Sequence, residues 1–185
     1  MKKLLNLKIL MSVCISVILL TSCSNLDIEK LNNKANDLMN TGDIDGAISR
    51  LESINDLNPG FPQTHYNLGV AYHKKGNYDK SVAELNKAIK LKPDFADAYY
   101  TLGVVCEENA LNLIDQNKNN KTLDEKTILT VSDNFKEAQK AYIQYINLAK
   151  NSSDTQNIKN KIETLDNDIK KYDDMLNSNN QELNY

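Results

Sequence analysis

A spacing of 34 residues recurs along the middle of this chain and constrains its fold more than any other feature. Four pairs of residues repeat at this interval: Gly42 with Gly76, Pro59 with Pro93, Phe61 with Phe95, and Gly69 with Gly103. A fixed period of this size indicates stacked repeats, each folding as one pair of helices. The sequence therefore predicts an all-α chain without strands.

Glycine and proline mark the expected ends of these helices. Gly76 lies between Lys75 and Asn77, where it is expected to end a helix in the left-handed conformation. Pro93 cannot continue the following helix, so the next repeat is expected to begin just after it.

Two other glycines fall inside a predicted helix. Glycine at Gly69 and Gly103 costs about 1 kcal/mol relative to alanine, so some other contact must offset the loss. Close approach of the second helix of each pair would do so. The small residues expected to face the two glycines are Ser81 and Ala138.

This pattern resembles the tetratricopeptide repeat (TPR) family. Residues 62–95 match its pattern at Leu68, Gly69, Tyr72, Gly76, Tyr78, Ala88 and Pro93. Residues 28–61 resemble a weaker copy in the same register, and residues 96–150 resemble a third. The resemblance implies an all-α, TPR-type helix-turn-helix solenoid of about three repeats over residues 28–153.

The third copy carries an insertion. Gly69 and Tyr78 are nine residues apart, whereas the matching Gly103 and Phe135 are 32 apart, which leaves 23 extra residues. Apolar residues keep helical spacing on both sides, so we expect an extended hairpin around 112–133 with a polar turn over 116–121. Lineage drift and a partner-specific projection both account for such an enlargement.

The return helix of this hairpin has a predicted start and a predicted weak point. Thr122 to Glu125 resembles a capping box that opens the helix. The polar segment from Ser132 to Asn134 is where the helix would break if it were not continuous.

A last helix is expected over about 155–177, with a frayed tail over 178–185. Its apolar residues are spaced by 4, 3, 4, 3 and 4: Ile158, Ile162, Leu165, Ile169, Tyr172 and Leu176. The stripe fits a capping helix, residues 154–177, that covers the last repeat. The alternative is a coiled-coil seam that pairs two copies into a weak homodimer.

The first 22 residues have the organisation of a signal peptide. Three lysines precede a mostly apolar run of 12 residues over 9–20, which is shorter than the roughly 20 residues of a transmembrane helix. Leu20-Thr21-Ser22-Cys23 resembles a bacterial lipobox, which implies cleavage after Ser22 and lipid attachment at Cys23. An ordinary secretory signal or an uncleaved anchor is the alternative. Residues 23–27 would form a short lipidated linker.

Charge and cysteine content exclude other classes of protein. Loss of residues 1–22 removes three lysines and no acid, so the formal net charge changes from −3 to −6. A mildly acidic chain without a basic cluster is a poor nucleic-acid binder. Cys106 would have no intrachain disulfide partner, and it falls at the repeat position of Tyr72, which predicts a small buried residue.

No arrangement of residues typical of an enzyme is evident. His65 and His73 are about 12 Å apart on one helix, too far to share a metal ion, and His65 takes the position of a packing aromatic residue. The adjacent acidic pairs at 107–108 and 173–174 are expected on solvated helix faces. We therefore expect no enzymatic activity, no cofactor and no metal site.

The family resemblance supplies a candidate binding groove. In the TPR family, the first helices of successive repeats line a concave surface that binds peptides or helices. The residues at matching positions are Asn32, Asn36, Tyr66, Val70, His73, Tyr100, Val104 and Glu107. The alternative for the two tyrosines is that they only support neighbouring helices.

The chemistry of this lining suggests a kind of partner. Some TPR proteins grip a C-terminal carboxylate with basic residues, but Thr101 and Asp97 stand where two of these are required. The lining suits a partly extended or helical segment with apolar anchors and some basic character.

The sequence thus predicts a lipid-anchored adaptor or scaffold of the bacterial cell envelope that binds unidentified envelope proteins. It would sit on the cell membrane or outer membrane, on the periplasmic or surface face. Ser24 is not the aspartate that marks inner-membrane retention, which favours the outer membrane in a cell with two membranes. The alternative is a structural or surface-exposed lipoprotein that self-associates through its C-terminal helix.

Overall fold

The structure is a computed structural model that describes residues 27–118, 122–150 and 153–182, and all regular elements within these ranges are helices. The chain divides into two compact units, residues 1–59 and residues 60–185. The predicted signal peptide and Cys23 lie outside the described residues.

The first unit contains a helix-turn-helix pair. A helix over 27–40 is followed by α2 (Ile44–Leu57). Gly42 in the turn has a φ of 88°, a conformation that only glycine adopts without a steric penalty. The Asp43 carboxylate then accepts a hydrogen bond from the backbone N–H of Gly46 at 2.9 Å, which caps α2.

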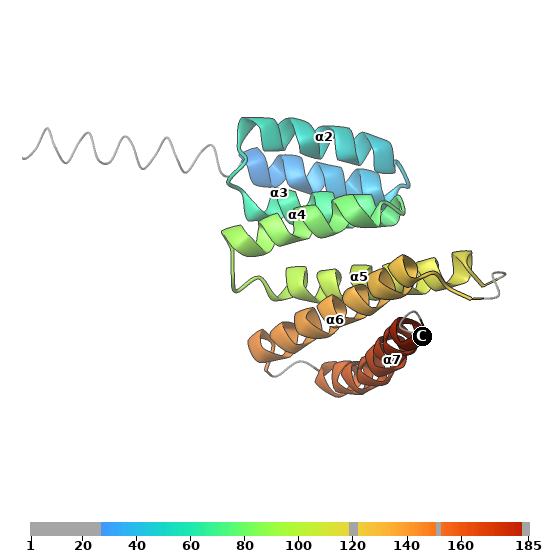
Figure 1. The fold of residues 1–185 in the computed structure, drawn as a ribbon. Coiled ribbons are helices and arrows are strands. Elements are labelled where there is room, and N and C mark those ends of the chain that lie inside the picture. Colours follow the sequence, from blue (N-terminus) through green and yellow to red (C-terminus); the bar gives the residue numbers. More distant parts are fainter. Residues whose placement is uncertain (1–26, 119–121, 151–152, 183–185) are drawn as a thin grey trace, which may run out of the picture. The chain divides into compact units, whose positions relative to one another are not determined.

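The second unit contains five helices in a row. They are α3 (Pro62–Lys74), α4 (Tyr78–Leu91), α5 (Ala96–Gln116), α6 (Glu125–Leu148) and α7 (Thr155–Glu182). Each of them packs against the next one along the chain (Figure 1). The pairs α3–α4 and α5–α6 are the second and third predicted repeats.

The turn between α3 and α4 has the predicted geometry. Gly76 has a φ of 75°, and the next residue, Asn77, caps α4. The side-chain carbonyl of Asn77 accepts a hydrogen bond from the backbone N–H of Lys80 at 3.2 Å. Glycine therefore ends one helix and the adjacent amide begins the next, so only three residues separate them.

Gly69 allows α3 and α4 to pack closely. The Ser81 hydroxyl donates a hydrogen bond to the Gly69 carbonyl at 2.7 Å, which confirms the predicted contact. A Cβ at Gly69 would lie only 2.6 Å from Cγ of Leu85. Any side chain here would force the two helices apart.

Gly103 meets a different neighbour from the one predicted. A Cβ at Gly103 would lie 2.6 Å from Cε1 of Tyr142, and the closest atoms all belong to that ring and none to Ala138. Helical side chains lean toward the N-terminus of their helix, so the residue one turn after Ala138 covers the glycine. Leu85 takes the same place relative to Ser81 in the other pair.

The insertion makes α5 and α6 long. They have 21 and 24 residues, against 13 in α3 and 14 in α4, and α6 continues without a break through residues 132–134. The extended hairpin is therefore helical on both sides, as predicted. Residues 119–121 of the expected turn lie outside the described residues.

The start of α6 corrects one prediction. Its cap is Asp124, whose carboxylate accepts a hydrogen bond from the backbone N–H of Thr127 at 2.6 Å. The capping box beginning at Thr122 is therefore wrong by two residues. The extended backbone of Asp124 aims its short side chain at the first free N–H groups of the helix.

The last helix is longer than predicted. It continues to Glu182, so residues 178–182 are helical and not a frayed tail. No glycine or proline occurs after residue 155, so nothing in the backbone stops the helix where its apolar stripe ends.

The apolar stripe of α7 is used inside the chain. Ile158, Leu165 and Tyr172 are each less than 5% exposed, and the other stripe residues are half-buried against the same core. The ring of Tyr172 lies 5.9 Å from that of Phe135 on α6. The helix is therefore a cap on the third repeat, and its stripe is not an open seam for a second copy.

Candidate functional site

Six of the eight predicted groove residues lie in the second unit, on the neighbouring helices α3 and α5. Tyr66, Val70 and His73 come from α3, and Tyr100, Val104 and Glu107 come from α5. Spacings of 4 and 3 place each set of three on one helix face. The helices α3 and α5 contact each other, and hydrogen bonds between Tyr66 and Thr101 and between His73 and Glu108 bring the two faces next to each other.

Tyr100 presents an aromatic surface to solvent. Its side chain is 40% exposed, although its ring lies 5.2 Å from that of Tyr145 and 6.1 Å from that of Tyr142. Val104, one turn further along α5, is half-buried against the core. This part of α5 therefore offers apolar surface on a firm support.

Tyr66 has a more structural role. It is half-buried, and its ring packs 5.0 Å from that of Phe95. Its phenolic oxygen accepts a hydrogen bond from the Thr101 hydroxyl of α5 at 3.5 Å. The two open alternatives for the tyrosines thus separate: Tyr66 supports neighbouring elements, whereas much of Tyr100 stays accessible.

His73 joins the two helices by a polar contact. Its Nε2 lies 2.7 Å from a carboxylate oxygen of Glu108, which is half exposed. The ring of His73 also lies 6.0 Å from that of Tyr78. This predicted contact residue therefore already has partners in the chain.

The sequence predicted that Glu107 lies on a solvated helix face. In the structure its carboxylate is instead hydrogen-bonded within the chain. The Tyr142 hydroxyl donates a hydrogen bond to its carboxylate at 2.7 Å, and Lys161 of α7 donates to both oxygens at 2.7 and 2.6 Å. Burial of Tyr142, together with this hydrogen bond, raises the pKa of its phenol well above the usual value. The pairing with α7 depends on tertiary packing, which helical spacing alone does not reveal.

Asp173, in the second acidic pair, is 38% exposed, as expected of a solvated face, but its carboxylate also has partners within the chain. Its carboxylate accepts hydrogen bonds from Lys136 Nζ at 2.8 Å and from the Ser132 hydroxyl at 2.6 Å, which lowers its pKa. The contact links α6 to α7. It also engages Ser132, in the polar segment where α6 would break if it were not continuous.

The two groove residues of the first unit are less available than predicted. Asn32 is only 1% exposed, and its side-chain amide donates a hydrogen bond to the Ile28 carbonyl at 3.0 Å. Asn36 is half-buried on the same helix. A buried, hydrogen-bonded Asn32 does not offer its side chain to a partner.

Leu111 was missed by the sequence analysis. It is 51% exposed and lies seven residues, or nearly two turns, after Val104 on the same face of α5. The signal in the sequence was the spacing of Tyr100, Val104 and Leu111 by 4 and 7 residues.

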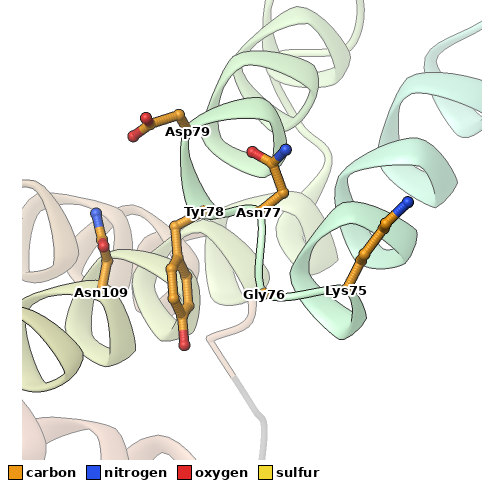
Figure 2. Close-up of a pocket in the computed structure, with 6 residues that line it drawn as sticks. All are labelled: Lys75, Gly76, Asn77, Tyr78, Asp79 and Asn109. Carbon is orange, nitrogen blue, oxygen red and sulfur yellow. The ribbon is translucent and has the colours of Figure 1, made fainter.

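Two hollows lie beside the α3–α4 turn, and no predicted groove residue lines either of them. The first, of about 380 Å³, is lined by residues 75–79 and Asn109. Figure 2 shows Tyr78 beside Asn109 of α5, while Lys75 points away from them. The second, of about 460 Å³, shares Asp79 and Asn109 and reaches the start of α6. The first is mainly polar, whereas the lining of the second is mixed, and α5 of the extended hairpin contributes to both.

His65 and Cys106 are core residues, as predicted. His65 is 4% exposed, and its Nδ1 lies 2.7 Å from a carboxylate oxygen of Glu84, which joins α3 to α4. Cys106 is 2% exposed; burial, with a smaller effect of Glu137, raises the pKa of its thiol to about 12. A thiol that stays protonated is a weak nucleophile.

The described part of the chain contains no group of three histidine, cysteine or acidic side chains arranged to hold a metal ion. No helix among the described residues combines the length and the apolar character needed to cross a lipid bilayer.

Comparison with known proteins identifies the repeat. Residues 71–109 match the family model of the TPR repeat. None of the curated proteins matches the sequence.

Solved structures similar to this chain include several TPR domains and a type III secretion chaperone. The first TPR of Spaghetti (RPAP3), bound to an HSP90 peptide, is 20% identical and has a TM-score of 0.56, covering 74% of this chain and 90% of that chain. The Sgt2 TPR domain of Aspergillus fumigatus is 21% identical, with a TM-score of 0.57 and coverage of 80% and 82%. The type III secretion chaperone SycD of Yersinia enterocolitica, in complex with a peptide of the translocator YopD, is 13% identical, with a TM-score of 0.52 and coverage of 77% and 91%.

These findings establish the fold of the chain. The chain has the all-helical fold of TPR solenoids, with a long helix as its C-terminal cap. The family match within residues 71–109 supports the TPR as its repeating unit.

Proposed function

We propose that this protein is a lipid-anchored adaptor of the bacterial cell envelope that binds a segment of a partner protein along α3 and α5. Its task is binding and not catalysis. The anchor is a lipid at Cys23, and the partner is another protein at or near the same membrane.

The observation that carries the binding role is the accessible aromatic surface of Tyr100. A tyrosine that is 40% exposed, and backed by two further tyrosine rings, has a fixed position and a large apolar area. Rigid aromatic side chains of this kind are enriched at the energetic centres of protein interfaces.

Proteins with the same fold support this role. The RPAP3 domain holds an HSP90 peptide, and SycD holds a peptide of YopD. A helical stack in which α3 and α5 contact each other offers the same kind of surface here, with Tyr100 and Val104 on α5 and Val70 on α3.

The anchoring role is supported by the sequence Leu20-Thr21-Ser22-Cys23 at the end of a short apolar run. Only three residues separate Cys23 from the first helix at residue 27, a reach of at most about 14 Å. Two or more acyl chains would hold the domain stably at the bilayer surface.

Crosslinking in native membranes tests the binding role. Tyr100→Ala should abolish the adduct formed by the wild-type protein, because the exposed aromatic ring that contacts the partner is lost. Tyr100→Phe keeps the ring and should keep the adduct. Leu129→Ala is the matched control, since Leu129 is 49% exposed on α6. Equal adducts from Tyr100→Ala and Leu129→Ala would exclude this face as the binding site.

Processing and lipid labelling test the anchor. Cys23→Ser should leave an unprocessed precursor that incorporates no labelled palmitate. A Cys23→Ser protein that is cleaved and labelled normally would refute the lipobox while leaving the binding role open to the first experiment.

A further inference from the structure

One face of α5 carries three apolar side chains in a line. Tyr100, Val104 and Leu111 are separated by 4 and 7 residues, so their directions around the helix axis differ by no more than about 40°. Tyr100 and Leu111 are 40% and 51% exposed, and Val104 between them is half-buried.

The insertion in the third repeat creates the far end of this line. The residue that matches Leu111 in the second repeat is Asn77, which lies in the turn after α3. Because α5 continues to Gln116, the apolar face extends past the point where α3 ends.

The charged residue within this line is already neutralised. Glu107 lies between Val104 and Leu111, and its carboxylate is paired with Lys161 and Tyr142. A partner that covered this part of α5 would not bury an uncompensated charge, so the whole line is suited to docking.

Charge along α5 selects the sign of the partner. The helix contains four acidic residues, Asp97, Glu107, Glu108 and Asp115, and no lysine, arginine or histidine. Two of these, Asp97 and Glu108, are exposed near the apolar line, and Glu108 also contacts His73 of α3. A segment with basic residues beside its apolar ones therefore complements the face.

The spacing of the three anchors selects the conformation of the partner. Along the helix axis they are about 6 Å and about 10.5 Å apart, since the rise is about 1.5 Å per residue. A second α-helix running beside α5 repeats these intervals on one face. An extended strand presents one face only every second residue, at about 6.6 Å, and does not match the longer interval.

We propose that the occupant of this face is a basic amphipathic helix of a partner protein, which docks along α5 on Tyr100, Val104 and Leu111. The proposal rests on the binding role given above and adds the length, charge and conformation of the partner segment. Leu111, supplied by the insertion, is then a specificity-determining residue.

A synthetic helical peptide provides the test. It carries leucines at relative positions 1, 5 and 12 with lysines beside them, and its controls are a scrambled peptide of the same composition and a version with glutamate for lysine. Binding to the full-length protein, produced with Cys23→Ser, is measured by fluorescence anisotropy. We expect the patterned peptide to bind at least tenfold more tightly than either control, and added salt to weaken it.

Matched variants locate the binding. Leu111→Ser should weaken the patterned peptide about fivefold, whereas Leu129→Ser, equally exposed on α6, should leave binding unchanged. Both side chains are exposed, so neither change should unfold the protein. Equal binding of the scrambled peptide, or no effect of Leu111→Ser, would overturn the proposal.

Two further results separate this inference from the proposed function. If Tyr100→Ala abolishes the native-membrane adduct but Leu111→Ser does not affect it, the binding face stands and the helical occupant is wrong. If the protein alone sediments as a dimer that Leu111→Ser dissociates, the occupant is a second copy and the proposal fails.

Discussion

The second and third repeats use the same packing scheme at different helix lengths. In each, a mid-helix glycine receives the side chain at one fixed position of the partner helix, Leu85 for Gly69 and Tyr142 for Gly103. These two residues are 57 apart, which is one period of 34 plus the insertion of 23. The insertion thus lengthens both helices at the turn and leaves the packing register unchanged.

The difference between the repeats lies in what the longer pair acquires. Tyr142 is larger than Leu85 and brings a hydroxyl, which reaches Glu107 and through it Lys161 of the cap. The longer α5 also gains Leu111 on its exposed face. An insertion outside the repeat core therefore changes surface chemistry and capping without altering the fold.

The largest expected effect comes from filling the two glycine contacts. Gly69→Leu and Gly103→Leu should each lower the free energy of unfolding by about 3 kcal/mol, because the helices are forced apart. Gly103→Leu should be the worse, since the ring of Tyr142 is rigid and fully buried. Urea unfolding followed by circular dichroism measures both, with Lys140→Leu on an exposed part of α6 as control. An unchanged unfolding midpoint for Gly103→Leu would refute the shared register.

The next largest effect is expected for the reactivity of Cys106, which in the third repeat occupies the position of Tyr72 and is buried. With Cys14 and Cys23 replaced by serine, the remaining thiol should react with iodoacetamide at least about 100-fold more slowly in the folded than in the unfolded protein. Because burial raises the pKa of the thiol to about 12, its neutral form favours the folded state below its ordinary pKa of 9.0. That contribution should be lost as the pH rises from 9 toward 12, and Cys106→Ala should show a smaller loss. Rapid labelling of the folded protein would contradict the burial.

A smaller effect isolates the hydroxyl that only the third repeat has. Tyr142→Phe should lower the free energy of unfolding by about 1.5 kcal/mol, since Glu107 loses one hydrogen bond and keeps its pairing with Lys161. Tyr100→Phe is the control at an exposed ring. Equal thermal unfolding midpoints for Tyr142→Phe and Tyr100→Phe would show that the hydrogen bond from Tyr142 to Glu107 adds little stability.

The smallest effect concerns the start of the longer return helix. Asp124→Ala should lower the unfolding midpoint slightly, while Thr122→Ala should not change it, because Asp124 provides the cap. The hydrogen bond from Thr127 lowers the pKa of Asp124, so its contribution is present above its ordinary pKa and is lost as the pH falls toward and below it. If Thr122→Ala lowered the unfolding midpoint more than Asp124→Ala, the predicted capping box at Thr122 would be correct after all.

Features that depend on local spacing could be predicted from the sequence. The left-handed Gly42 and Gly76, the helical extension of the third repeat and the burial of Cys106 all follow from the repeat register. Predictions that needed a neighbour from elsewhere in the chain were less successful. Glu107 and Asp173 look solvated by their spacing, yet each contacts a side chain 35 to 54 residues away in sequence.

For the candidate binding face, too, local spacing could be predicted from the sequence but contacts with distant residues could not. Periodicity placed Tyr66 and Tyr100 at matching positions, but it could not tell which of them packs and which stays accessible. That depends on Phe95, which packs against Tyr66, and on Tyr142 and Tyr145 of α6, which support the ring of Tyr100.

The amino-acid sequence by itself determined the repeat, its register and the helical character of the insertion, because these depend on the periodic placement of glycine, proline and apolar residues. Only the tertiary structure decided which side chain fills each glycine contact, how α7 is held, and which part of α5 remains open. Those outcomes depend on side-chain direction and on pairing between distant helices, and a period along the chain encodes neither.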